Sequence, residues 1–252
     1  MKKGQTTIFI ILAIVIVIII ALFLFLKDTT EDRGRNYFVE QGLQPSINNV
    51  QNFIVDCLEI NAKDAVVKIG IQGGYFNKPS NFFDMQWAFI PYYYDQGTFL
   101  QPTQQQIETE LSNYVDSNME KCLSKIEFKN LELKYQPSST KATIQPSFVR
   151  FTSKLPTIIE HEGNTVIFDL DQHPVAINSS LKEIIEVATF ITNSHKENPD
   201  LMCINCITEL AKERKLYVDF IAFEEDTTLV MILENRTMEH PYIFEFLNRY
   251  TV

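Results

Sequence analysis

The chain has 252 residues, of which 45% are hydrophobic, and it carries a formal net charge of −10 at pH 7. This length is enough for one large or two small buried cores. An acidic surface repels nucleic-acid phosphates and anionic lipid headgroups, and no basic run offsets that charge locally. We therefore expect no nucleic-acid partner.

The amino-terminal region contains an uninterrupted apolar run, Thr6–Leu26, without a charge, a proline or a glycine. As a helix with about 1.5 Å of rise per residue, the run is about 31 Å long, which matches the hydrocarbon core of a bilayer. Lys2, Lys3 and Lys27 flank it, so cations at both ends can reach the headgroups. The run predicts a transmembrane helix that anchors the protein in the lipid bilayer.

The predicted organisation has four parts: a cytoplasmic tail or cleavable leader, the transmembrane helix, a polar linker, and an α+β ectodomain with a candidate subdivision near residue 125. These parts are residues 1–5, 6–26, 27–45 and 46–252. The cysteines are even in number and lie outside the span, which is typical of an oxidising exterior. They are Cys57, Cys122, Cys203 and Cys206, and they allow three connectivities. Together with two glycosylation sequons, they predict a body outside the cytoplasm.

The extreme amino terminus, Lys2-Lys3-Gly4-Gln5 followed at once by the apolar run, resembles the class III signal peptide of archaeal type IV pilin-like proteins. In that family a peptidase cuts after the glycine, which implies cleavage between Gly4 and Gln5 and retention of the apolar segment. Many pilins have a glutamate at the fifth mature position, where this chain has Phe9. That difference argues against filament assembly but leaves membrane anchoring intact.

The body resembles uncharacterised single-pass surface proteins of small-genome archaea. In those proteins a cysteine-bearing helix, a Gly-Gly loop, a tyrosine cluster and a late CxxC follow in this order. The resemblance implies a location at the cell surface and no particular activity.

Two amphipathic helices open the body. The apolar stripe predicts one from Ser46 to Gly70 and a second that begins at Pro102-Thr103. Cys57 and Cys122 each fall on an apolar face, so packing of the helices would allow a disulfide worth about 4 kcal/mol in the chain-entropy model. Two buried free thiols are the alternative.

The segment between these helices is rich in glycine and aromatic residues. Gly73-Gly74 predicts a helix stop and turn, because a phosphate-binding loop needs a strand before it and a helix after it. Residues 82–94 predict a buried strand that ends at Pro91, or alternatively an aromatic binding face. Since side chains of a strand alternate, we expect at least one of the three consecutive tyrosines to face solvent or a partner. The candidate partner-binding residues are Trp87, Tyr92, Tyr93 and Tyr94.

The second half alternates with a period of two from residue 126 to 177, which predicts an antiparallel meander. Two helices and three strands are expected after it. The predicted helices cover residues 180–193 and 199–214, and the strands cover 216–223, 228–233 and 242–247. Runs of helix and runs of strand, rather than strict alternation, indicate an α+β fold of helices packed on an antiparallel sheet.

Cys203-Ile204-Asn205-Cys206 is the best candidate for chemistry. At a helix start, which Asp200 would cap, the dipole lowers the pKa of the first thiol and makes it a nucleophile. A thioredoxin-like enzyme would have a strand before the motif, whereas a helix is predicted there, so we favour a structural disulfide. As a zinc site the motif supplies half the ligands, and Cys57 with Cys122 would have to complete it.

Carboxylates and imidazoles also gather at His161-Glu162 and at Asp169, Asp171 and His173. Such groups can hold a divalent ion, but they are equally typical of polar turns, which we favour. The chain contains no nucleophile-elbow serine, zincin helix or Walker loop. We therefore expect no metal, no cofactor and no enzymatic activity.

The sequence as a whole predicts a membrane-anchored surface protein with a structural, adhesive or partner-binding role. Self-association and a surface protein partner are both open. The alternative is a membrane-tethered thiol–disulfide oxidoreductase that uses Cys203 and Cys206. A third hypothesis is a partner of a secretion or pilus machine that never polymerises.

Overall fold

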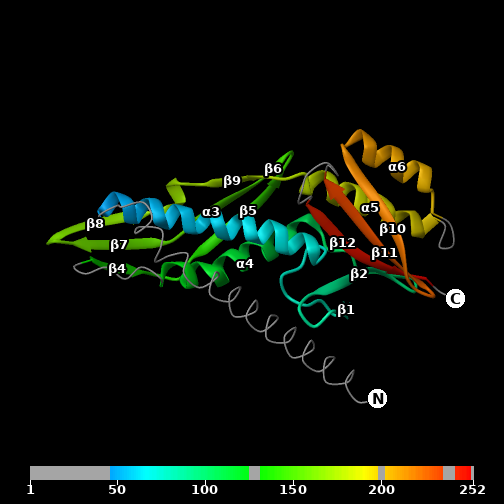
Figure 1. Cartoon of the computed structure of the whole chain (residues 1–252), viewed down its shortest axis with the longest axis horizontal. Helices are drawn as coiled ribbons and strands as arrows, with labels where there is room; N and C mark the ends of the chain where they lie inside the picture. Colours follow the sequence, from blue (N-terminus) through cyan, green and yellow to red (C-terminus); the bar gives the residue numbers. More distant parts are fainter. Residues whose placement is uncertain (1–45, 125–130, 198–201, 235–241, 251–252) are drawn as a thin grey trace, which may run out of the picture.

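The computed structural model describes residues 46–124, 131–197, 202–234 and 242–250. The predicted leader, transmembrane helix and linker lie outside these ranges. Among the described residues, no helix is both long and apolar enough to cross a membrane. They form an α+β structure, as predicted, with two lobes arranged along one long axis (Figure 1).

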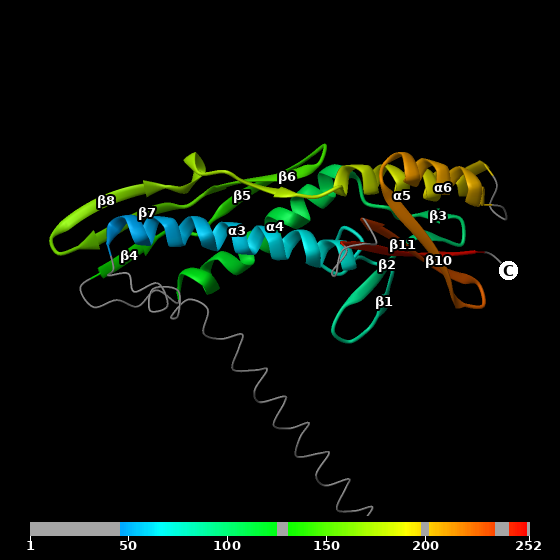
Figure 2. The same cartoon turned by 45° about the horizontal axis from the view of Figure 1, so that its top comes forward.

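The elongated lobe is built on two helices, α3 (Ile47–Ile71) and α4 (Gln104–Leu123), which lie side by side (Figures 1 and 2). Ser46 caps α3 by accepting a hydrogen bond at 3.3 Å from the backbone amide three residues further on. At the start of α4, Thr103 and Gln106 form a reciprocal capping box. Both predicted helices are confirmed.

A disulfide joins the two helices. Cys57 is fully buried on α3 and bonds to Cys122 on α4, with 5.9 Å between their Cα atoms. The predicted disulfide is therefore present, and the alternative of two buried free thiols is wrong.

The end of α3 is a tight helix stop, as the Gly-Gly pair predicted. The helix runs one residue past the expected Gly70, to Ile71, and Gly73 and Gly74 then adopt positive φ angles of 52° and 88°. A Cβ at Gly73 would overlap the carbonyl oxygen of Glu245, so only glycine fits this contact.

Six strands of the elongated lobe form two small antiparallel sheets, ordered β4-β7-β8 and β5-β6-β9. Their bounds are β4 (Leu131–Tyr135), β5 (Ser139–Gln145), β6 (Phe148–Lys154), β7 (Pro156–His161), β8 (Asn164–Asp169) and β9 (Val175–Asn178). A 3-10 turn, Leu170–Gln172, precedes β9. The predicted antiparallel pairing of neighbours is confirmed for the hairpins β5-β6 and β7-β8.

The strands do not form a simple meander, because β4 pairs with β7 and β6 pairs with β9. The segment from β4 to β7 is one long hairpin. One arm consists of β4 and β5, the other of β6 and β7, and both arms are interrupted at the same distance from the hairpin turn. Pro137 lies in one break and Pro156 follows the other, and proline has no N–H with which to continue a ladder. The long hairpin runs beside α3 and gives the lobe its length (Figure 2).

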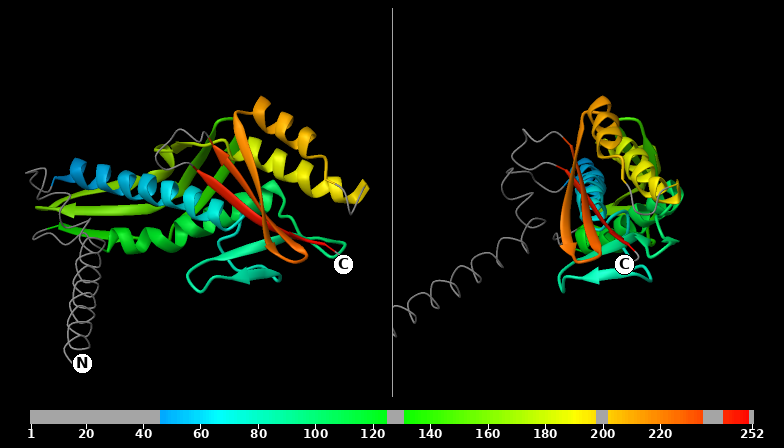
Figure 3. Two further views of the ribbon diagram at one scale, coloured as in Figure 1. Left: turned by 45° about the vertical axis from the view of Figure 1, so that its right-hand side comes forward. Right: turned by 90° about the vertical axis from the view of Figure 1, so that its right-hand side faces the viewer.

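The distal lobe lies at the end of α3 opposite Ser46 (Figure 1). Its main sheet has the order β1-β2-β12-β11-β10, with β3 on β2, and β12 runs parallel to β2. The strands are β1 (Phe82–Asp84), β2 (Phe89–Asp95), β3 (Thr98–Phe99), β10 (Leu216–Glu224), β11 (Thr227–Glu234) and β12 (Ile243–Arg249). Two helices, α5 (Leu181–Glu197) and α6 (Ile204–Glu213), cover one face of the sheet (Figure 3).

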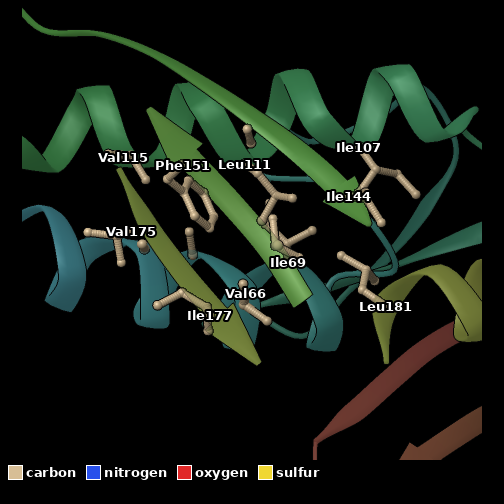
Figure 4. Packing of buried hydrophobic residues seen from close by; sticks show 14 of the residues in the cluster. Val66, Ile69, Ile107, Leu111, Val115, Ile144, Phe151, Val175, Ile177 and Leu181 are labelled. Carbon is tan, nitrogen blue, oxygen red and sulfur yellow. The ribbon is translucent and has the colours of Figure 1, made fainter. Parts of the chain in front are cut away.

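One buried core extends through both lobes. Figure 4 shows the part where side chains of α3, α4 and the β5-β6-β9 sheet meet, among them Ile69, Leu111 and Phe151. Phe244 and Phe246 of β12 continue the same core into the distal lobe.

Candidate functional site on the distal lobe

The three consecutive tyrosines of β2 are all buried, with exposed fractions of 7%, 1% and 3% for Tyr92, Tyr93 and Tyr94. The expectation that at least one of them faces solvent is wrong. The favoured interpretation of a buried strand is confirmed for β2, although a turn that contains Trp87 divides residues 82–94 into two strands. The strand also continues through Pro91 to Asp95 instead of ending at the proline.

A register shift explains why the tyrosines do not alternate between core and solvent. Opposite β2, the consecutive residues Leu247 and Asn248 of β12 pair with Tyr92 and Tyr94, so Tyr93 is an extra residue in the ladder. Such a bulge interrupts the period of two on which the sequence argument depended. Tyr92 can then face one side of the sheet, while Tyr93 and Tyr94 each contact different buried side chains.

Tyr93 belongs to the main core. Its ring stacks on Phe246 with centroids 4.2 Å apart, and its hydroxyl donates a hydrogen bond of 2.9 Å to the Gly73 carbonyl. Complete burial raises its pKa well above the ordinary tyrosine value. The side chain therefore stays neutral and serves the fold.

Tyr94 contributes to a buried polar cluster under α5. Its ring stacks on the imidazole of His195 at 4.9 Å, and Tyr250 meets the same imidazole edge-on. The Nε2 atom of His195 lies 3.2 Å from the Asn248 amide nitrogen. Burial lowers the pKa of His195, so the imidazole is neutral at physiological pH.

Trp87 is the exposed member of the four predicted partner-binding residues, with 68% of its surface accessible. It lies in the turn between β1 and β2, where Asp84 accepts a 2.8 Å hydrogen bond from the Gln86 amide. Lys78 pairs with the same carboxylate at 2.8 Å and, as the main cause, lowers the pKa of Asp84. The turn thus holds an indole in solvent on an ordered backbone.

The outer face of the distal sheet, turned away from α5 and α6, carries an apolar patch. We call the following residues the outer patch: Phe83, Met85, Tyr92, Ile221, Phe223, Leu229 and Leu247. Ile221, Leu229, Leu247 and Tyr92 are direct cross-strand neighbours and form a row across four strands. Within the described ranges, no helix residue belongs to this cluster. Figure 3 shows the sheet with both helices on its other side.

A charged group lies at the margin of the outer patch. The Arg249 guanidinium lies 4.9 Å from the ring centre of Tyr92 and pairs with Asp95 at 2.7 Å. Ile221 at 43% exposure and Trp87 are open to contact. An aromatic and aliphatic centre with arginine at the rim is the composition of a protein-binding surface.

Sequence reasoning missed the outer patch, although a signal for it exists. Strands β10 and β11, which read LYVDFIAFE and TTLVMILE, are apolar at odd and even positions alike. A run without alternation is typical of a strand that is covered on both faces. On the outer face, Leu247 and Tyr92 are buried by other residues of the same cluster, whereas Ile221 remains exposed.

The CxxC motif lies at the start of α6, at the far end of the distal lobe (Figure 1). Cys203 is the N-cap residue, its Sγ accepts a hydrogen bond of 3.3 Å from the Cys206 amide, and the two cysteines form a disulfide. Both are exposed. Asp200, the predicted cap, lies outside the described residues. As predicted, a helix (α5) precedes the motif.

The structure does not bring the candidate metal ligands together. Cys57 and Cys122 are bonded to each other and do not complete a four-cysteine site with the CxxC. His161 is the last residue of β7 and Glu162 lies in the β7-β8 turn, whereas Asp169 pairs with Pro156 at the opposite end of that hairpin. Among the described residues, no group of three or more histidine, cysteine or acidic side chains is placed to hold a metal ion.

Comparison with known proteins finds no match for this chain among family models, curated proteins or solved structures.

Proposed function

We propose that the protein is a membrane-anchored surface protein whose distal lobe binds a partner protein. The observation that carries the proposal is the outer patch together with Trp87, an apolar face next to an exposed indole on an ordered turn. Tryptophan and arginine are enriched among the residues that contribute most to protein–protein binding. At the margin of the outer patch Ile221 is exposed, and Phe83, Met85, Phe223 and Leu229 are half-buried. Apolar groups that lie together at a surface mark interaction sites more often than scattered single residues do.

The predicted membrane span and the outer patch are compatible with one arrangement of the protein at the membrane. The predicted span precedes α3, and α3 extends from Ser46 to the distal lobe, about 37 Å for a helix of this length at about 1.5 Å per residue. The spacing supports a role in which a rigid rod holds the binding face away from the point where the chain enters the ectodomain. The net charge of −10 favours a protein partner over nucleic acid.

Site-specific photocrosslinking in native membranes tests this proposal. A photoreactive amino acid replaces Trp87 in the full chain, and a matched control replaces Ile167, which is 72% exposed on β8 of the elongated lobe. We expect discrete crosslinked products from position 87 that are missing from position 167. Mass spectrometry of the product identifies either a second surface protein or a second copy of the chain. No product from position 87, or equal products from both positions, would overturn the proposal.

The pilin-like leader has its own test. We propose processing after Gly4, in accordance with the resemblance of the first residues to class III signal peptides. The mass of the amino-terminal peptide from native membranes would then correspond to a chain that begins at Gln5. Electron microscopy of material sheared from the cells separates a filament subunit from an anchored monomer. An intact Met1 in the membrane fraction would exclude the processing.

A further inference from the structure

We infer that the Cys203–Cys206 disulfide is a redox site that accepts electrons from a dithiol of another protein outside the cytoplasm. This inference is independent of the outer patch. It starts from the difference between the two disulfides of the molecule. Cys57 is fully buried between two helices, whereas Cys203 and Cys206 are both exposed at the far end of the distal lobe. An attacking thiolate can reach the second disulfide without any opening of the fold.

The local geometry favours Cys203 as the leaving group. Its sulfur lies at the N-cap of α6, where the positive end of the helix stabilises a thiolate. The Cys206 amide already donates a hydrogen bond to that sulfur, and the same bond would hold the anion after cleavage. A leaving thiolate that is stabilised in this way departs faster. The sequence supplies no lysine, arginine or acidic residue between the two cysteines, so the helix end is the electrostatic feature of the motif.

The exchange proceeds in two balanced steps. A thiolate of the partner attacks the Cys206 sulfur, a mixed disulfide forms, and the S–S bond to Cys203 breaks with its electron pair moving to Cys203. The second thiolate of the partner then attacks the partner sulfur of the mixed disulfide, and Cys206 leaves as a thiolate. The partner gains a disulfide and loses two electrons and two protons, which end on Cys203 and Cys206.

Accessibility of the neighbouring surface supports contact with a polypeptide. Ile204, between the two cysteines, has 47% of its surface exposed, and Asn205 is exposed as well. A partner chain laid against the motif therefore meets an apolar side chain and an amide next to the reactive sulfurs. Met202, immediately before the motif, packs partly into the main core and fixes the loop to the fold.

The first test compares the two disulfides within one protein. The full chain in detergent is equilibrated with increasing dithiothreitol, quenched with an alkylating mass tag and digested for mass spectrometry. We expect Cys203 and Cys206 to become labelled at a reductant concentration at least ten times lower than Cys57 and Cys122. Joint opening of both disulfides, or earlier opening of Cys57–Cys122, would overturn the inference.

The second test measures electron transfer to the motif. The oxidised full chain is mixed, without oxygen, with a synthetic peptide that contains two free cysteines. We expect the peptide to gain an internal disulfide in a one-to-one ratio with the protein, and the Cys203→Ser/Cys206→Ser variant to produce none. Single variants, each with one free thiol, separate the roles of the two cysteines. The Cys203 thiol left in Cys206→Ser should react with iodoacetamide near pH 6 about ten times faster than the Cys206 thiol left in Cys203→Ser. Equal rates with no peptide oxidation would identify a structural clip.

Discussion

The β5-β6 pair of the elongated lobe and the β10-β11 pair of the distal lobe differ in their outer faces. In the elongated lobe, the solvent side of the β5-β6 pair carries Lys141, Thr143 and Arg150, which alternate with buried residues. In the distal lobe, the corresponding side of β10 and β11 carries Ile221 and Leu229. A polar outer face stabilises a sheet that remains in water, whereas an apolar outer face is suited to being covered. This difference between the two strand pairs supports the binding face that we propose on the distal lobe.

The largest expected effect concerns the disulfide of the elongated lobe. Cys57→Ser with Cys122→Ser removes a link across 65 residues and should lower the free energy of unfolding by about 4 kcal/mol. Cys203→Ser with Cys206→Ser removes a disulfide that closes a far smaller loop, and we expect a loss of at most about 2 kcal/mol. Urea unfolding followed by circular dichroism measures both values. Equal losses would show that the two disulfides support the fold alike.

The next effect concerns binding by the distal lobe. Trp87→Ala should weaken binding of the captured partner by about 2 kcal/mol, roughly thirty-fold. Because the indole is exposed, the free energy of unfolding should change by no more than about 0.5 kcal/mol. Ile167→Ala on the elongated lobe is the matched control and should leave the Kd unchanged. Equal weakening by the two substitutions would contradict the contrast between the lobes.

A smaller effect concerns the buried side of the distal sheet. The pKa of His195 is lowered in the folded protein by burial, against about 6.5 in an unfolded chain. The unfolded state therefore binds a proton more readily below about pH 6.5, so stability is present above that pH and is lost as the pH falls. His195→Phe, which retains an aromatic ring beside Tyr94, should flatten the dependence of unfolding free energy on pH between 7 and 5. An unchanged dependence in the His195→Phe variant would contradict this role of His195.

The smallest effect concerns the turn that presents Trp87. The pKa of Asp84 is lowered by its hydrogen bonds from Lys78 and from the Gln86 amide. The stabilisation is therefore present above the unfolded carboxyl pKa of about 4 and is lost as the pH falls below it. Asp84→Asn should speed amide hydrogen exchange at Gln86 at neutral pH while exchange in β11 stays the same. Unchanged exchange at Gln86 would show that the carboxylate does not order the turn.

Features that depend on nearby residues could be predicted from the sequence. The caps and apolar stripes of α3 and α4 are local patterns, and two cysteines on facing stripes predicted the Cys57–Cys122 bond. The position of the CxxC motif at the start of a helix, with another helix before it, also follows from a local pattern. The glycine stop after α3 also followed from a short motif.

Features that depend on distant pairing could not be predicted. The burial of Tyr92 to Tyr94 depends on a bulge opposite β12, which lies about 150 residues further along the chain. The pairing of β4 with β7 depends on simultaneous breaks in two arms of one hairpin. The outer patch is a row across four strands, and a single sequence does not say which strands are neighbours.

Trp87 also has an optical consequence. It is the single tryptophan of the chain, so all indole fluorescence of the protein comes from the β1-β2 turn. An exposed indole emits at long wavelength and is open to collisional quenchers such as acrylamide. A partner that covers the turn would shift the emission to the blue and protect it from quenching. The unlabelled protein can therefore report, in real time, whether its proposed binding face is occupied.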